Sequence, residues 1–299
     1  REPSMNEKLM GVFAPITTPF TADGTVDYSG LEHNVRAYAK SGLKGFLALG
    51  SNGENKSLTN EEKLKVLEII CTCKREDQVV MAGCIFESTF ETIEMAHRME
   101  AYHPDFLTLL PPNYFKKQMT DDVLCRYFTD VAEAVHTPCL VYNAPQYAGG
   151  VGLSIPLIKR VAQHPNIVGV KDSSTGNIES ILFAVRNHFD VMAGSINNFF
   201  MGMITGASGG VLSLADSFPD ITVELYRLLA SKHYDKAVAL NDRILQINKI
   251  VSGKGGVAAV KYAMDLNGLV GGYPRLPLLP LAEEDKAGIQ EKLAAEGLL

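Results

Sequence analysis

The chain has 299 residues, a formal net charge of -6 at pH 7 and 46% hydrophobic residues, a composition that is ordinary for a globular protein. The acidic balance and the scattered Lys and Arg residues argue against a nucleic-acid-binding protein. No apolar run approaches the ~20 residues that a membrane-spanning helix needs, so we expect no membrane segment.

Short apolar runs recur along the chain and predict buried parallel strands, because both faces of each run are apolar. Eight such runs are present: Val12–Ile16, Gly45–Leu49, Val79–Gly83, Phe106–Leu110, Pro138–Tyr142, Ile167–Val170, Val191–Gly194 and Gly210–Leu214.

Amphipathic stretches of helical period separate these runs. They are Asp27–Lys40, a stretch that Thr59 and Glu62 open as a capping box, Ser88–Met99, Asp121–Val135, Ser154–Ala162 and Asn177–Asn187. The alternation predicts an α/β fold, a closed TIM (β/α)8 barrel over residues 1–230. A doubly wound open sheet is the alternative, but Thr17–Phe20 after the first run is not the phosphate loop that such a sheet normally carries.

The pattern changes after about residue 230, where no further strand is expected. Tyr234–Ile250, Gly256–Leu266 and Glu283–Ala295 read as helices. Residues 231–299 are therefore predicted to form a C-terminal helical extension of the barrel.

The cysteine and histidine residues show no metal-binding spacing. Five cysteines are an odd count, and Cys71 and Cys73 lack a second Cys or His pair. We interpret them as reduced thiols of a cytoplasmic protein, and we expect no metal.

Lys171 directly follows the buried run Ile167–Val170 and is the first candidate for chemistry, since barrel enzymes carry their reactive groups at the carboxyl ends of strands. Burial favours the neutral amine, which attacks a ketone to form an imine. The alternative is a lysine that extends its charged end into solvent from a strand end. Tyr142 ends the neighbouring run of the barrel, so its phenol could relay protons to and from the carbinolamine; a packing role is the alternative.

The segment Gly50–Glu54 forms a glycine-bracketed turn after the second run. Its backbone N–H groups and the Ser51 and Asn52 side chains could bind a carboxylate. The alternatives are a plain turn with a helix cap, and a structural role for Glu54 as a buried carboxylate.

At these residues the sequence resembles the dihydrodipicolinate synthase / N-acetylneuraminate lyase family of Schiff-base aldolases, over nearly the whole chain from Gly11 onward. The motifs that carry the resemblance are Gly50-Ser51-Asn52-Gly53-Glu54, Tyr142-Asn143-Ala144-Pro145, Gly169-Val170-Lys171-Asp172-Ser173, Gly209-Gly210-Val211, Val260-Lys261 and Arg275-Leu276-Pro277.

The resemblance implies roles for the reacting groups. Lys171 would be the Schiff-base lysine and Tyr142 the proton relay. Ser51, with Gly50 and Asn52 in the same turn, would hold the pyruvate carboxylate and also pass protons.

The resemblance also implies further contacts and an assembly. Tyr114 would reach across a dimer interface into the partner's site, the Val211 carbonyl would face the substrate, and Ser173 would touch the hydroxyl at the bond being broken. A homotetramer made of two dimers is expected, with no metal or organic cofactor beyond the covalent imine.

Two departures bear on the substrate. The family's synthases have an Arg five residues after the relay Tyr, where this chain has Tyr147, and a phenol cannot supply a guanidinium's bidentate clamp. Ser51-Asn52 replaces the usual Thr-Thr and resembles the 4-hydroxy-2-oxoglutarate aldolases. We therefore expect an aldolase that joins pyruvate and an aldehyde or cleaves a 4-hydroxy-2-oxo acid.

Three alternatives stay open. The chain could be a dihydrodipicolinate synthase that condenses pyruvate with aspartate semialdehyde. It could be a lyase of N-acetylneuraminate or of 2-keto-3-deoxy sugar acids. It could also be a non-catalytic protein that binds a 2-oxo acid, because a fold does not imply a function.

Overall fold

A computed structural model describes residues 6–176, 178–185 and 188–299. The strands form a closed parallel barrel in the order β1 to β8, which confirms the predicted TIM barrel. No helix within the described residues is both long and apolar enough to cross a membrane.

The observed strands lie at the predicted positions. They are β1 (Val12–Pro15), β2 (Gly45–Ala48), β3 (Val79–Gly83), β4 (Phe106–Leu109), β5 (Cys139–Asn143), β6 (Ile167–Asp172), β7 (Asp190–Ala193) and β8 (Gly209–Val211). The last strand ends earlier than expected, because a short helix begins at Leu214.

The helices include the predicted ones and some that were not foreseen. They are α1 (Tyr28–Ala39), α2 (Asn60–Cys73), α3 (Thr89–Glu100), α4 (Asp121–Ala134), α5 (Ile155–Val161), α6 (Ile178–Val185), α7 (Ile196–Thr205), α8 (Leu214–Ser217), α9 (Pro219–Ala230), α10 (Tyr234–Ser252), α11 (Gly256–Leu266) and α12 (Glu283–Ala295). The expectation missed α7, α8 and α9. Asn177 and Asn187, the ends of one predicted helix, lie outside the described residues.

Side-chain caps explain where many helices begin, because each accepts a backbone N–H that the first turn leaves unpaired. The capping box of Thr59 and Glu62 is present as predicted. Other caps of this kind are Asp27, Ser88, Thr120, Ser154 and Ser195.

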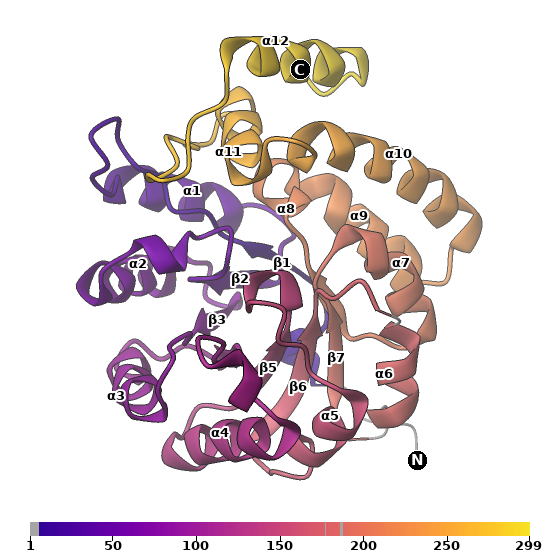
Figure 1. Cartoon of the computed structure of the whole chain (residues 1–299). Coiled ribbons are helices and arrows are strands. Elements are labelled where there is room, and N and C mark those ends of the chain that lie inside the picture. Colours follow the sequence, from indigo (N-terminus) through magenta and orange to yellow (C-terminus); the bar gives the residue numbers. More distant parts are fainter. Residues whose placement is uncertain (1–5, 177, 186–187) are drawn as a thin grey trace. The chain divides into compact units, whose positions relative to one another are not determined.

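The chain divides into two compact units. Unit 1 comprises residues 1–11 and 79–211, in which β3 to β8 pair in sequence order. Helices α4, α5 and α6 follow one another along this ladder in Figure 1. The strands are buried almost throughout, so the ladder holds the side chains at its ends rigidly.

Unit 2 comprises residues 12–78 and 212–299. Strands β1 and β2 pair in parallel, and α1 packs against α2. Helices α10, α11 and α12 contact one another and form the expected C-terminal helical part (Figure 1). The proposed boundary of the extension at residue 231 stays a prediction.

Candidate functional site

Lys171 and Tyr142 lie directly opposite each other in the parallel ladder of β6 and β5. Parallel partners in register project their side chains to the same face of the sheet. The Nζ atom of Lys171 lies 3.9 Å from the centroid of the Tyr142 ring. Both side chains are buried, with residue exposures of 5% and 2%. The expected pairing of a buried amine with a phenol is therefore present in unit 1.

Asp172 follows the lysine and points to the opposite face of β6, because side chains alternate along a strand. Its Oδ1 atom accepts hydrogen bonds from Asn143 Nδ2 at 3.0 Å and from Ser174 Oγ at 2.7 Å. Burial raises the pKa of this carboxyl above its usual range, although the bonds from Ser174 and Asn143 oppose the shift. These contacts fix the ends of β5 and β6, where Tyr142 and Lys171 lie.

Ser173 is buried beside the same strand ends. Its N–H donates to the Asn143 carbonyl at 2.9 Å, and its hydroxyl donates to the Gly194 carbonyl at 3.3 Å. A Cβ atom at position 194 would lie only 1.9 Å from Ser173 Oγ. Glycine is required at this close approach, and it fixes the place of the Ser173 hydroxyl.

Tyr147 lies in a short 3-10 helix, Pro145–Tyr147, that follows β5. The residue is 54% exposed, and its pKa is raised by partial burial and by the charge of the neighbouring Tyr142. The phenol that occupies the place of the family's Arg therefore lies near the proton-relay candidate. Val211 ends β8 and is buried.

Tyr114 does not point into the buried part of unit 1. Its side chain is 80% exposed, and its ring contacts that of Phe115 edge-on, with centroids 5.1 Å apart. The Glu87 carboxylate holds the loop by accepting the N–H groups of Tyr114 and Asn113 at 3.0 Å. Sequence reasoning missed Glu87, which lies beyond the end of β3. The expectation that Tyr114 completes a partner's site stays a prediction.

The turn after β2 lies in unit 2 and is tightly closed. Gly53 donates its N–H to the Gly50 carbonyl at 3.1 Å, and Glu54 donates to the Ser51 carbonyl at 2.9 Å. Leu49 and Glu54, at the two ends of the turn, have φ values of 61° and 52°. A left-handed backbone is unfavourable for such residues, so other parts of the fold must hold it.

Asn52 uses its side-chain amide within the protein. Its Nδ2 atom donates to Ser213 Oγ at 2.7 Å and to Asp216 Oδ2 at 3.2 Å. An amide nitrogen has two N–H donors, so these bonds occupy both. Carboxylate binding by this turn would then depend on the Ser51 hydroxyl and on backbone N–H groups, and the Asn52 side chain would not be a donor.

Glu54 is a buried structural carboxylate, as one of the alternatives stated. It forms a short ion pair with Lys261, whose Nζ also donates to the carbonyls of Thr18 at 2.8 Å and Tyr273 at 2.9 Å. The other Glu54 oxygen accepts the N–H of Arg275 at 2.9 Å. Burial lowers the pKa of Lys261, and the neighbouring Glu54 opposes the shift. This network holds the left-handed conformation of Glu54.

Sequence reasoning missed Ser213 and Asp216. Both follow β8, so the rule that functional side chains follow strand ends would have included them. That rule was not applied to the eighth run, which was expected to continue as a strand to Leu214, and Val211 was named only because the resemblance implies its role.

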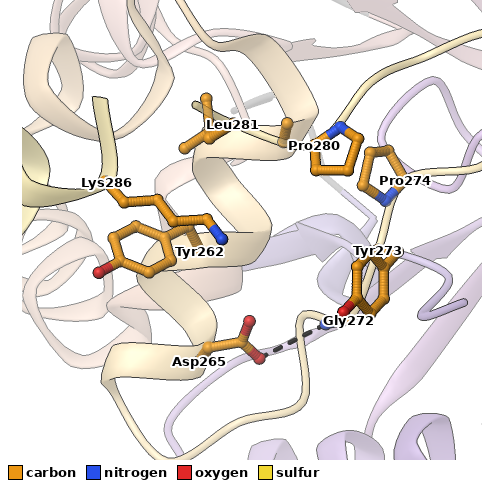
Figure 2. A pocket seen from close by; sticks show the side chains of 9 residues that line it. Tyr262, Asp265, Gly272, Tyr273, Pro274, Pro280, Leu281 and Lys286 are labelled. Atoms are coloured by element: carbon orange, nitrogen blue, oxygen red, sulfur yellow. Dashed lines mark hydrogen bonds between the residues drawn. The ribbon is translucent and has the colours of Figure 1, made fainter. Parts of the chain in front are cut away.

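A further pocket of about 170 Å³ lies in unit 2, and none of the predicted site residues lines it (Figure 2). Asp265, one of the residues that line it, accepts the N–H of Gly271 at 2.7 Å, and Lys286 extends from α12 beside Tyr262. No group of three or more His, Cys, Asp or Glu side chains that could hold a metal ion occurs in the part of the chain that the structure describes.

Known proteins resemble the chain over nearly its whole length. The 4-hydroxy-tetrahydrodipicolinate synthase of Acidiphilium cryptum is 31% identical over 292 residues, which cover 97% of this chain and 99% of that protein. The pyruvate complex of the dihydrodipicolinate synthase of Acinetobacter baumannii has a TM-score of 0.91 at 30% identity, over 97% of this chain and 100% of the other. A catalytic lysine mutant of the Ruminococcus gnavus sialic acid aldolase has a TM-score of 0.89 at 25% identity, covering 99% of each chain.

The model of the dihydrodipicolinate synthetase family matches residues 8–296. That span includes the candidate residues of each unit and the C-terminal helices. The chain therefore belongs to the dihydrodipicolinate synthetase family and is a carbon–carbon lyase of the aldolase type.

Proposed function

We propose that the chain is a Schiff-base aldolase that forms or cleaves a carbon–carbon bond between pyruvate and an aldehyde, with Lys171 as the nucleophile. The observation that carries the proposal is the buried Lys171 amine, 3.9 Å from the Tyr142 ring and opposite it in the ladder. A desolvated amine beside a phenol supplies the nucleophile and the proton donor that imine formation requires.

The chemistry follows from these two groups. The Lys171 nitrogen adds to the C2 carbonyl of a 2-oxo acid, Tyr142 protonates the oxygen, and loss of water gives the imine. In the cleavage direction the Tyr142 oxygen, which has given its proton to the departing water, takes the proton of the C4 hydroxyl. The C3–C4 bond then breaks, its electron pair moves into the protonated imine to form an enamine, and the aldehyde is released. Protonation at C3 and addition of water then release pyruvate and the free amine.

The position of the Tyr142 ring has a consequence for the intermediate. The negative face of an aromatic ring attracts a cation within about 6 Å. The protonated imine formed at Lys171 is such a cation, and it would lie over the same ring. Tyr142 would then stabilise the intermediate through its ring as well as relay protons through its hydroxyl.

The other site residues complete the proposal. The turn at Gly50–Gly53 would bind the substrate carboxylate through Ser51 and backbone N–H groups. Tyr114 is exposed, which suits a role in the site of a second subunit of a cytoplasmic homotetramer. Neither the metal nor the organic cofactor that some aldolases use is required by this scheme.

The substrate that we propose is a 4-hydroxy-2-oxo acid. Tyr147 lies near Tyr142 where the synthases carry a guanidinium, so this end of the site offers a phenol for a hydroxyl or a carboxyl group. Ser173, with its hydroxyl held by Gly194, would contact the C4 hydroxyl. The second candidate is synthesis of 4-hydroxy-tetrahydrodipicolinate, which relatives at 30–31% identity are named for.

Borohydride trapping tests the proposal directly. Pyruvate and borohydride should add one reduced pyruvate unit to the wild-type chain, and peptide mapping should place it on Lys171. The variant Lys171→Met keeps the apolar stem and should not be labelled. Lys159→Met, on the exposed side of α5, is the matched control and should be labelled like the wild type. An unmodified Lys171 in the wild type would exclude the mechanism.

A substrate screen then decides between the two candidates. Pyruvate release is measured with 4-hydroxy-2-oxoglutarate, sialic acid and 2-keto-3-deoxy sugar acids, and condensation of pyruvate with aspartate semialdehyde in parallel. The proposal expects the highest kcat/KM with the 4-hydroxy-2-oxo acid. Turnover restricted to aspartate semialdehyde would instead establish the synthase.

A further inference from the structure

Asp216 is a carboxyl with no solvent exposure, on the short helix α8. Its Oδ2 atom accepts from Asn52, and its backbone carbonyl accepts from the Tyr38 hydroxyl at 2.5 Å. Within the described residues, its Oδ1 atom and the neighbouring Ser217 hydroxyl have no hydrogen-bond partner. The Asp216 side chain therefore has one hydrogen bond among the described residues, and that bond is with the candidate carboxylate-binding turn.

Burial and the lack of a paired cation favour the neutral form of Asp216. No cation pairs with it among the ion pairs of the described residues. Burial raises its pKa well above the usual range, and the bond from Asn52 only partly opposes the shift. The neighbouring titratable group is Tyr38 of α1, and its pKa is raised by burial and by the charge of Asp216. An unpaired buried carboxylate would be costly, so the neutral form is the stable one.

Asn52 needs such an anchor because of its position. Asparagine in a turn readily hydrogen-bonds nearby backbone groups, and this would consume the N–H groups that a bound carboxylate requires. Ser213 and Asp216 occupy both of its amide donors, so the side chain is turned away from its own backbone. The left-handed residues at the two ends of the turn, Leu49 and Glu54, also require the turn to be held from outside.

We propose that Asp216 is a positioning residue for substrate binding: it acts through Asn52 to keep the donors of the Gly50–Gly53 turn available to the carboxylate of the 2-oxo acid. This inference rests on the proposed function, because it assigns the turn to that carboxylate. It predicts a defect in substrate affinity and no defect in imine chemistry.

The experiment measures the pyruvate concentration that gives half-maximal borohydride trapping of Lys171. Asp216→Ala should raise it about tenfold, in line with the loss of one buried hydrogen bond, and should leave trapping at saturation unchanged. Asp216→Asn keeps a neutral acceptor and should stay within about threefold of the wild type. Ser217→Ala, which removes the neighbouring hydroxyl with no contact to Asn52, is the matched control and should match the wild type.

A double-mutant cycle separates positioning from a general structural role. In the background Asn52→Ala, adding Asp216→Ala should cause no further rise in the half-saturating concentration, because the proposed action passes through Asn52. If Asp216→Ala does not fold, Ser213→Ala removes the other acceptor and should raise the concentration about threefold.

Several results would overturn the inference. A folded Asp216→Ala protein with wild-type half-saturation would do so. Equal impairment in Asp216→Asn and Asp216→Ala would do so, as would additive effects in the cycle with Asn52→Ala. Failure of the proposed function looks different, since the wild type itself would then take no label at Lys171.

Discussion

Two buried carboxyl groups hold the same turn in unit 2, and they do so by different means. Glu54 faces the Lys261 ammonium, which donates also to two backbone carbonyls. Asp216 faces the Asn52 amide and no cation. The charged pair of Glu54 and Lys261 holds one end of the turn, whereas the buried Asp216 carboxyl holds its middle through Asn52.

The difference shows two ways in which a buried carboxyl group near a candidate substrate site can avoid an uncompensated charge. At Glu54 the charges balance, so removal of one partner leaves the other charged and buried. At Asp216 burial is balanced by protonation, so replacement by a neutral group of the same shape changes little. Neither Glu54 nor Asp216 would then repel a carboxylate substrate with an uncompensated negative charge.

The largest expected effect on stability comes from the charged pair of Glu54 and Lys261. Lys261→Met leaves the Glu54 carboxylate buried without a cation and should lower the free energy of unfolding by about 3–5 kcal/mol. Urea denaturation at pH 7 measures this loss. Adding Glu54→Gln should restore part of the stability, because the uncompensated charge is then gone. If the double variant is less stable than Lys261→Met alone, the charge is not the cause.

An intermediate effect on stability is expected when the pH is raised, because Asp216 then loses its proton. The pKa of Asp216 is raised on folding, so its contribution is complete below the unfolded pKa near 3.8 and is lost as the pH rises through the folded pKa. Each pH unit in that window should remove about 1.4 kcal/mol from the wild type relative to Asp216→Asn. Urea denaturation of both proteins between pH 4 and pH 8 checks this. Parallel curves would show that Asp216 is charged in the folded state.

The smallest effect on stability is expected at the partly exposed pair of Glu62 and Arg275, which lies near the pair of Glu54 and Lys261. Two bonds of 2.8 Å join the groups, and Arg275 lowers the pKa of Glu62 to about 2. The contribution of this pair to the free energy of unfolding is present above 4.5, the pKa of Glu62 in the unfolded chain, and is lost as the pH falls toward the pKa of Glu62 in the folded chain. Glu62→Gln should cost about 1 kcal/mol at pH 7 and less at pH 3. A constant cost over this range would assign the loss to the helix cap of Thr59.

Most of the barrel could be predicted from the sequence, because its strands are short apolar runs and its early helices carry side-chain caps. Helix α9 was missed, since it begins at Pro219 with no side-chain cap. Helix α7 was missed although local signals for it exist, because Ser195 caps it and its buried residues Ile196, Phe199 and Gly202 recur every three residues.

The candidate site was predictable in part, for a similar reason. Lys171 and Tyr142 end consecutive runs, and consecutive strands of a barrel are neighbours, so sequence order already places them together. The partner of Asn52 lies 164 residues away on α8. No periodicity or spacing links two such positions, so only the folded chain shows which donors of the turn are already in use.

The close packing of Gly194 on Ser173 constrains how this site can diversify. Any side chain at position 194 would occupy the space of the Ser173 hydroxyl, so substitution there alone is incompatible with the present backbone. Conversely, shortening Ser173 to alanine would not make room at 194, because the Cβ atom of residue 173 and the Asp172 carbonyl oxygen would each still lie 2.9 Å from the added Cβ atom. Variants that aim to redirect substrate preference by changing Ser173 should therefore keep Gly194 fixed.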